Sequence, residues 1–403
     1  MVEIELKFQI SETRRTALLK ALDPKKSETI QLQAKYFDTP DRLLAQHGAA
    51  LRQRLEGTCW IQTLKAAGKS HLHRFEHNHN LGELESSPEL DLSIYADIPE
   101  AQQILTQALG SDAAALKLTF ETDIQRTYRV IEFEDAEIEV CLDVGVVRAS
   151  GREQTIHEVE FELKSGSVQS LLAFSFEWVK KYQLWLDVRS KAEMGNLLAL
   201  EQTVSPARFE KEFVLSKKES AAHNLSLLIG QQMQHLLPNI AAISAGVAEQ
   251  SHIDQAQTAL EHLQLTLALF KDWNSNISDK WAMQLAAFKH QFDHLQHLQH
   301  MQSTLGAFLQ NPTTTENLAK DILYAQEKLG NLVKSTQNVH HYLELLTFSL
   351  SSHDQVQKQD LKTRVLLIIC LLVLPLQAIK KKFSKNLLMI ASMVLLDQNI
   401  RLH

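Results

Sequence analysis

Hydrophobic and polar positions follow two different patterns along this chain. Through about residue 202, short runs alternate apolar and polar residues and are separated by turn residues such as Gly57 and Gly145. Alternation with a period of two is typical of strands that bury one face. We therefore expect a β-rich first half, to which two helices are added at Ser11–Leu22 and Ser167–Tyr182.

The second half has the period of helices. After Ser205 and Pro206, apolar residues recur three and four positions apart, as in residues 259–270 and 281–292. This spacing places them on one face of a helix, and several such helices pack as a bundle. The change of pattern predicts two domains, residues 1–203 and residues 204–403.

Charged residues occupy the polar positions of the predicted strands in an unusual way. Glu3, Glu5 and Lys7 share one face of the first strand, because residues two apart point the same way. Residues 158–164 repeat the arrangement, with three glutamates and a lysine alternating with apolar residues. Further charged positions on predicted strands are Arg52 with Arg54, Arg74 with Glu76, and Lys65.

Two interpretations of these charged faces are open. Each run taken alone fits a surface strand with a solvated face. Taken together, the runs fit the inside of a closed antiparallel barrel, with the apolar faces packed under covering helices. Buried charge without a partner is costly, so such an interior would need a ligand. A polyanion with divalent cations fits, because Lys and Arg bind phosphate and carboxylates bind hard metals.

The ordered motifs resemble those of the CYTH superfamily, the triphosphate tunnel metalloenzymes. The resemblance covers about residues 1–200 and rests on these segments in order: Glu3-x-Glu5-x-Lys7, Tyr36-FDTPDRLL, Leu51-RQR, Gln62-TLK, Arg74-x-Glu76, Thr122-DIQR, Asp143-x-Gly145, Glu158-VEFELKSG and Arg189-SKAEMG. It implies an α+β fold, in which an eight-stranded antiparallel β tunnel with flanking helices precedes an all-α helical bundle.

The resemblance also implies which residues form the site. The expected phosphate ligands are Lys7, Arg52, Arg54, Lys65, Arg74, Arg126 and Lys191. The expected ligands of one or two Mg²⁺ or Mn²⁺ ions are Glu3, Glu5, Asp143, Glu158, Glu160 and Glu162. Asp143 could instead orient a lysine or arginine, and Glu76 could bind metal or position water. The family's Ser-Lys-Ala-x-Arg-Gly motif has Met194 in place of the arginine, which predicts a local change in packing.

The activity implied by this resemblance is metal-dependent hydrolysis of inorganic triphosphate to pyrophosphate and phosphate. Alternatives on the same fold are a thiamine triphosphatase, a nucleoside triphosphatase and an adenylate cyclase. A non-catalytic scaffold that binds polyphosphate is a further alternative of a different class. No aromatic cluster that would hold a base is evident beside Lys65 or Arg126, which favours the inorganic substrate.

The helical half is similar to a degenerate CHAD domain, a helical bundle associated with polyanions such as polyphosphate. Residues 254–270 carry acids, amides and His262 where that family usually has basic residues, so polyphosphate binding by this half is not favoured. His290, His294, His297 and His300 share one helix face, and a solvated stripe is favoured over a metal or anion site. Residues 380–382 and Lys385 form a basic cluster, interpreted as a solvated helix end.

Composition narrows the partners and the compartment. The net charge is −7; residues 1–202 hold 23 Lys and Arg against 32 Asp and Glu, a balance of −9, which leaves +2 for the rest. Neither half has the basic composition of a nucleic-acid-binding domain. Three cysteines without a CxxC pair, and an N-terminus unlike a secretory signal, fit the cytoplasm. The apolar residues 365–376 are too few for a membrane span and predict a core helix.

Overall fold

The computed structural model describes residues 2–350, except 69, 71, 111, 212–218, 272–274 and 306–311. The apolar residues 365–376 and the basic residues 380–385 lie outside the described residues. Within the described part, no helix is long and apolar enough to cross a membrane. The two described cysteines, Cys59 and Cys141, are free thiols.

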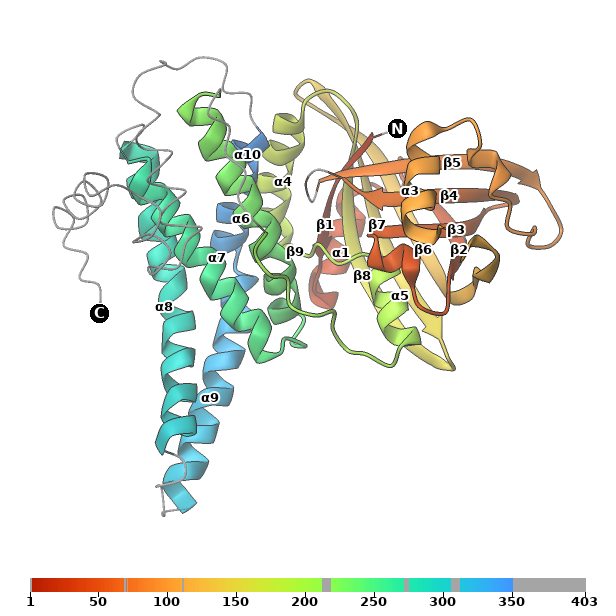
Figure 1. The fold of residues 1–403 in the computed structure, drawn as a ribbon. Coiled ribbons are helices and arrows are strands. Elements are labelled where there is room, and N and C mark those ends of the chain that lie inside the picture. Colours follow the sequence, from red (N-terminus) through yellow and green to blue (C-terminus); the bar gives the residue numbers. More distant parts are fainter. Residues whose placement is uncertain are drawn as a thin grey trace, which may run out of the picture.

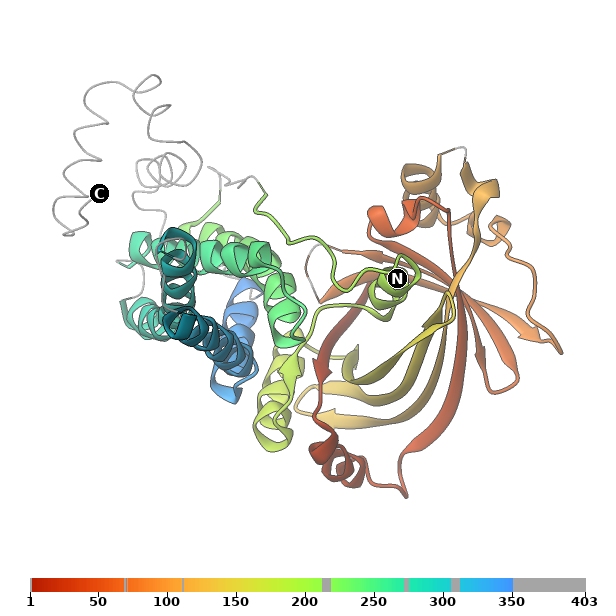
Figure 2. The ribbon, with the colours of Figure 1, turned by 90° about the horizontal axis from the view of Figure 1, so that it is seen from below.

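A closed antiparallel barrel forms the first part of the chain (Figures 1 and 2). Its strands follow the order β5-β4-β3-β2-β6-β7-β8-β1, and β1 also pairs with β5, which closes the ring. The short β9 adds to β1. The strands are β1 (Val2–Gln9), β2 (Glu28–Asp38), β3 (Ala49–Glu56), β4 (Cys59–Ala67), β5 (His73–Glu83), β6 (Lys117–Phe133), β7 (Ala136–Ala149), β8 (Arg152–Ser165) and β9 (Trp185–Leu186). The predicted eight-stranded tunnel is confirmed.

Helices cover the barrel and continue as a bundle. Those within the first part are α1 (Glu12–Ala21), α2 (Leu43–Gln46), α3 (Pro99–Leu109), α4 (Val168–Tyr182) and α5 (Lys191–Ala199), with short 3₁₀ helices at Ser93–Tyr95 and Asp112–Ala115. The bundle contains α6 (Ala221–Ser244), α7 (Gln250–Leu269), α8 (Ser275–Leu305), α9 (Pro312–Val333) and α10 (Thr336–Leu350). The helices expected at 11–22, 167–182, 259–270 and 281–292 are present as α1, α4, α7 and part of α8.

One apolar core joins the barrel to the bundle. Phe8 of β1 and Phe161 of β8 are fully buried on the outer face of the barrel, with ring centroids 5.1 Å apart. Phe161 also meets Phe174 of α4 edge to face. The same cluster continues through Leu228 of α6 and Tyr342 of α10, and α10 packs directly on α4. The helical half therefore covers one outer side of the barrel, and the domain boundary at 203/204 stays a prediction.

The histidine stripe of the helical half lies on an exposed surface. His290, His294, His297 and His300 are all exposed on α8. Among the described residues, the one group of three or more potential metal ligands close enough to share an ion consists of acids in the barrel. The solvated interpretation of the stripe therefore agrees with the structure.

Candidate functional site

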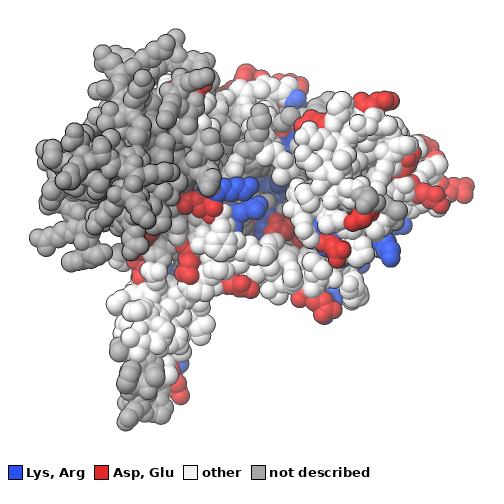
Figure 3. Space-filling model, viewed as in Figure 1, with Lys and Arg blue, Asp and Glu red and all other residues white. Residues whose placement is uncertain are grey.

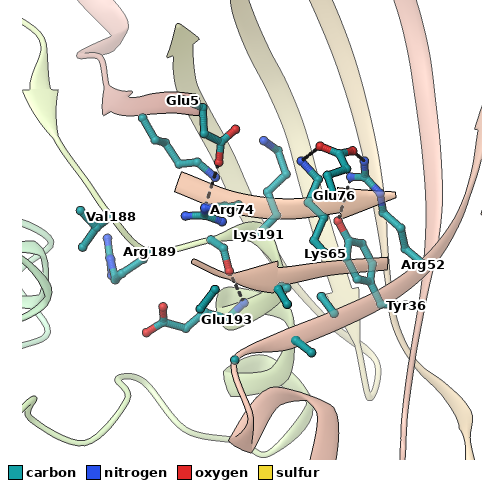
Figure 4. A pocket seen from close by; sticks show the side chains of 18 of the residues that line it. Glu5, Tyr36, Arg52, Lys65, Arg74, Glu76, Val188, Arg189, Lys191 and Glu193 are labelled. Atoms are coloured by element: carbon teal, nitrogen blue, oxygen red, sulfur yellow. Dashed lines mark hydrogen bonds and ion pairs between the residues drawn. The ribbon is translucent and has the colours of Figure 1, made fainter. Parts of the chain in front are cut away.

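A cavity of about 920 Å³ occupies the barrel interior. Among the described residues that line it, eleven are Lys or Arg and nine are Asp or Glu, so opposite charges are nearly balanced. Figure 4 shows some of these side chains, among them Glu5, Lys65 and Lys191, reaching into one space from several strands and from α5. Such a charged interior does not occur in an ordinary barrel core, which is filled by apolar side chains.

Strand register brings the charged residues together. The pleat directs Glu3, Glu5 and Lys7 into the barrel and the intervening apolar residues outward into the core. On adjacent strands, Arg126 lies opposite Asp143, and Asp143 lies opposite Glu158. The interior interpretation of the charged faces is therefore confirmed.

The first cluster consists of three acids, Asp143, Glu158 and Glu160, with ligand oxygens within 4.8 Å of one another. Arg126 donates two hydrogen bonds to Asp143, at 2.7 and 2.6 Å, and a third to Glu160. The ammonium group of Lys191 lies 2.7 Å from Asp143 and 2.9 Å from Glu160, and it also contacts Glu158. Asp143 thus orients both a lysine and an arginine in this structure.

Lys7 lies at the edge of the same cluster. Its Nζ is 3.3 Å from Glu160 Oε1 and 3.9 Å from Glu158 Oε1. Burial alone would raise the pKa of Glu160, but Lys191 and Lys7 hold it well below its usual range. Glu158 shows the opposite outcome, because its burial outweighs the lysines and raises its pKa.

A second cluster forms on the facing strands. Lys65 Nζ lies 2.8 Å from Glu3 Oε2 and 2.8 Å from Glu76 Oε2. Arg52 is 3.8 Å from Glu76 on the other side, and Arg74 Nε is 3.2 Å from Glu5 Oε1. The contacts of Glu76 with Lys65 and Arg52, and of Glu5 with Arg74, are visible in Figure 4. Each predicted phosphate ligand of this cluster is therefore held by a carboxylate.

The two acids that share Lys65 have different proton affinities. Burial is the largest cause that raises the pKa of Glu3 to about 8, although Lys65 opposes it. Glu76 is also buried, but Lys65 and a hydrogen bond from Glu3 lower its pKa. These shifts favour the protonated form of Glu3 and the ionised form of Glu76. Groups whose surroundings push their pKa values apart are common in catalytic sites.

Two predicted site residues lie outside these clusters. Arg54 contacts Glu56 near one end of the barrel, and burial followed by repulsion from Arg52 lowers its pKa to about 10. Glu162 pairs with Lys164 at 2.9 Å and does not belong to the three-acid group. Both still line the cavity, so the structure brings them to the site without placing them in its centre.

The three-acid cluster fits a divalent cation. Its donors are carboxylate oxygens, which hard cations such as Mg²⁺ and Mn²⁺ prefer. Oε2 of Glu158 is buried and has no hydrogen-bond partner among the residues that the structure describes. An orphaned buried carboxylate oxygen is costly, and a cation at this position would satisfy it. Burial disfavours the charged form of these acids, so positive charge close to them is needed to keep them ionised.

One wall of the cavity is apolar, which the charge pattern did not reveal. Ile30, Leu32, Ala34 and Tyr36 of β2 all face the cavity. Tyr36 stacks on Phe120 with ring centroids 4.4 Å apart, and its hydroxyl lies 3.5 Å from Arg52. The period-two pattern of β2 contains this signal, but apolar residues on an inner face look the same in sequence as those of a core.

Helix α5 explains the departure from the family motif. Ser190 caps this helix by accepting a hydrogen bond from Glu193 N–H. Met194 is buried in the apolar cluster that contains Tyr36 and Phe120. A Cβ at Gly195 would collide with the ring of Phe120, so only glycine fits there. The expected change in packing is therefore a hydrophobic contact, and Lys191 at the start of α5 still reaches the acids.

The sequence of this chain is similar to known proteins over part of its length. An inorganic triphosphatase from Haemophilus influenzae is 33% identical over 227 residues, which cover 55% of this chain and 62% of that protein. The chain thus matches less than two thirds of that relative's length. The CYTH domain family model matches residues 1–195.

Solved structures give weaker likenesses. A candidate adenylate cyclase from Bacillus halodurans aligns with a TM-score of 0.34 and 22% identity, covering 45% of this chain and 89% of that one. A candidate adenylyl cyclase from Hippeastrum, described as having a dominant triphosphatase activity, aligns with a TM-score of 0.37 and 16% identity, covering 50% and 97%.

The family match and the barrel cover the same part of the chain. The match ends within α5, and the charged clusters described above all lie inside that range. The CYTH domain family model thus matches the segment of the chain, residues 1–195, that carries the barrel and both charged clusters.

Proposed function

We propose that the barrel hydrolyses inorganic triphosphate to pyrophosphate and phosphate with Mg²⁺ or Mn²⁺. The observation that carries this proposal is the set of lysine and arginine side chains inside a closed barrel, most of them paired with carboxylates that could bind a metal ion instead. The 33% identical relative is named an inorganic triphosphatase, which supports the same activity. The proposed phosphate ligands are Lys7, Arg52, Arg54, Lys65, Arg74, Arg126 and Lys191.

Binding would exchange partners inside the cavity. In the structure, Lys65 and Lys191 each contact at least two carboxylates. When triphosphate enters, these ammonium groups turn to phosphate oxygens, and the carboxylates become available for metal. The proposed metal ligands are Glu3, Glu5, Asp143, Glu158, Glu160 and Glu162. This exchange keeps every buried charge paired, which avoids the cost of an isolated one.

The reaction is attack of water in line on the terminal phosphorus, with cleavage of the bond to the bridging oxygen and departure of pyrophosphate. A divalent cation, when bound, neutralises charge on the phosphate oxygens and makes water more acidic. The lysines and arginines stabilise charge on the transferred group and the leaving group. Glu76 is ionised and adjacent to Glu3, so it is the proposed acceptor of a hydrogen bond from the attacking water.

A second candidate substrate class follows from the apolar wall. Residues of β2 such as Ile30 and Leu32, together with Tyr36, could contact the organic part of thiamine triphosphate or a nucleoside triphosphate. The fold alone also accommodates adenylate cyclisation. Because twenty of the described residues that line the cavity are charged, we rank the inorganic substrate first.

Parallel assays with inorganic triphosphate, thiamine triphosphate and ATP test this ranking, each with Mg²⁺, Mn²⁺ or EDTA. We expect the highest kcat/KM with inorganic triphosphate and loss of turnover in EDTA. Faster turnover of an organic triphosphate would replace the substrate assignment. Formation of cyclic AMP without phosphate release would replace the reaction. Glu153→Gln is a suitable control variant, since Glu153 lies on β8 but is exposed outside the cavity.

A further inference from the structure

A segment outside the barrel strands contributes to the cavity wall. Residues 205–210, here called the strap, lead from α5 toward the helical half. Ser205, Pro206, Ala207 and Arg208 line the cavity, and so does Pro238 of α6. Figure 3 shows Lys and Arg side chains in the hollow between the helical half and the barrel. The helical half thus borders the same cavity as the barrel residues.

Buried polar side chains of the helical half fasten the strap. Asn239 of α6 is fully buried; its Oδ1 accepts a hydrogen bond from Arg208 N–H at 3.0 Å, and its Nδ2 donates to Arg208 O at 2.9 Å. His252 of α7 lies 2.9 Å from Ser205 O through its Nε2. These contacts hold the backbone at Arg208, and none of them involves its guanidinium group.

A third attachment holds the far end of the strap. Glu210 Oε1 accepts a hydrogen bond from Gln232 at 2.9 Å and lies 2.8 Å from Nδ1 of His262. The carboxylate of Glu210 is thereby directed to α6 and α7. It does not form an ion pair with Arg208, its close neighbour in the chain, within the described part of the structure.

Most arginines that line the cavity form an ion pair with a carboxylate of a described residue, and Arg208 does not. Arg52, Arg54, Arg74, Arg126 and Arg189 each pair with a carboxylate.

Arg208 is exposed and forms no ion pair with any described residue. Arg42 likewise has no carboxylate partner among the described residues, and its buried Nε has no hydrogen-bond partner there. Two arginines that line the cavity therefore lack a carboxylate partner.

Both arginines lie at the same end of the barrel. Arg42 directly precedes α2, and α2 packs on α5. The strap follows α5, and Ser205 Oγ donates a hydrogen bond to Glu193 of that helix. Positive charge without carboxylate partners in a cavity attracts anions, and an arginine binds phosphate through two parallel hydrogen bonds.

We propose that Arg208 and Arg42 form an additional phosphate subsite at the strap end of the cavity. The subsite receives phosphate units beyond the three that the barrel strands hold, so linear chains longer than triphosphate are also ligands. This inference rests on the proposed function, because it assumes that the barrel binds a phosphate chain. It also gives the helical half a role, namely to hold the strap that positions Arg208.

The test compares kcat/KM for linear tetraphosphate and inorganic triphosphate in the wild type and in Arg208→Gln. One lost charge-assisted contact is expected to lower the tetraphosphate value about tenfold and the triphosphate value less than about twofold. Arg42→Gln should act in the same direction, and Arg208→Lys should restore part of the loss. The control is Arg14→Gln, because Arg14 is exposed on α1 and lies outside the cavity.

The outcomes separate this inference from the proposed function. If triphosphate is hydrolysed but the ratio of the two kcat/KM values is unchanged in Arg208→Gln, the subsite is wrong. Equal loss for both substrates would also overturn it, since Arg208 would then belong to the triphosphate site. If neither chain is hydrolysed, the proposed function fails. In that case, dissociation constants of tetraphosphate and triphosphate are measured by calorimetry in EDTA. The subsite predicts that Arg208→Gln weakens binding of tetraphosphate more than binding of triphosphate, and equal effects would overturn it.

Discussion

The two faces of β1 and β8 carry side chains of opposite character, apolar on the outside of the barrel and charged on the inside. Outward, Phe8 and Phe161 are fully buried in an apolar core that extends into the helical half. Inward, Glu5 and Lys7 belong to a cavity of charged side chains. Burial of the apolar outer face is favourable by itself. On the inner face, the cost of removing charged groups from water roughly offsets the attraction between them. The outer face therefore stabilises the barrel, and the inner face prepares it for a charged ligand.

This difference explains the position of the helical half. A barrel filled with charge lacks the inner apolar core that stabilises an ordinary small barrel. The bundle and α4 supply that core on the outside, through contacts such as those of Leu228 and Tyr342. The same bundle fastens the strap through Asn239. Its contribution is thus both to stability and to the border of the cavity.

The largest expected effect is on the inner face. Glu5→Gln removes a proposed metal ligand, and we expect kcat/KM for triphosphate to fall about 10³-fold, since metal-ion catalysis contributes several kcal/mol. The free energy of unfolding should stay close to that of the wild type. Initial rates and urea unfolding measure the two quantities. Exposed Glu153→Gln is the control, and unchanged turnover in Glu5→Gln would remove this residue from the site.

The outer face should show the reverse. Phe161→Ala leaves a cavity in the shared core, and we expect the free energy of unfolding to fall by about 3 to 5 kcal/mol. The folded enzyme should keep its KM for triphosphate, because the phenyl ring points away from the cavity. Urea unfolding and steady-state kinetics at low temperature check both parts. A rise in KM without loss of stability would show that the two faces are coupled.

A buried histidine makes the stability of the helical half depend on pH. Among the described residues, neither ring nitrogen of His341 on α10 has a hydrogen-bond partner, and burial lowers the pKa of this histidine from 6.5 to about 4. Between these values the unfolded chain binds a proton that the folded protein does not. Stability is therefore lost as pH falls from 6.5 to 4, by up to about 3 kcal/mol.

Unfolding of His341→Leu across the same pH range measures this contribution. The difference in stability between wild type and variant should widen as pH falls and stay constant above about pH 7. His297→Gln is the matched control, because His297 is exposed on α8. A parallel pH dependence in wild type and His341→Leu would assign the effect to another group.

The smallest expected effect is stabilisation by ligand. At a concentration of 100 times its Kd, triphosphate should raise the free energy of unfolding by about 2.7 kcal/mol. Arg52→Gln should lose most of this increment at the same concentration, whereas Phe161→Ala should keep it despite a lower baseline. Thermal unfolding with and without triphosphate measures the increment. An equal increment in Arg52→Gln would place the ligand elsewhere.

Sequence reasoning predicted the charged face of the barrel well, for a physical reason. A strand has a period of two, so the positions of Glu3, Glu5 and Lys7 fix which side they share. Which residues lie opposite one another on neighbouring strands depends on the strand order and register, and the sequence does not show either. The grouping of Asp143 with Glu158, and the separation of Glu162 from them, therefore emerge only in the structure.

The strap was missed because its role depends on distant contacts. Arg208 lies in a polar stretch with no motif, and its position depends on Asn239, thirty-one residues later in the chain. The inward apolar residues of β2 were missed for a different reason. Ile30 and Leu32 carry the pattern of an ordinary half-buried strand, and only closure of the barrel turns that face toward the cavity.

Phosphorus NMR of the wild-type protein with inorganic triphosphate decides whether the charged barrel is a metal-dependent triphosphatase. With Mg²⁺ or Mn²⁺, we expect one pyrophosphate and one phosphate to appear for each triphosphate consumed, and EDTA should stop the reaction. Triphosphate that stays intact with either metal, or is consumed equally fast in EDTA, would contradict this account.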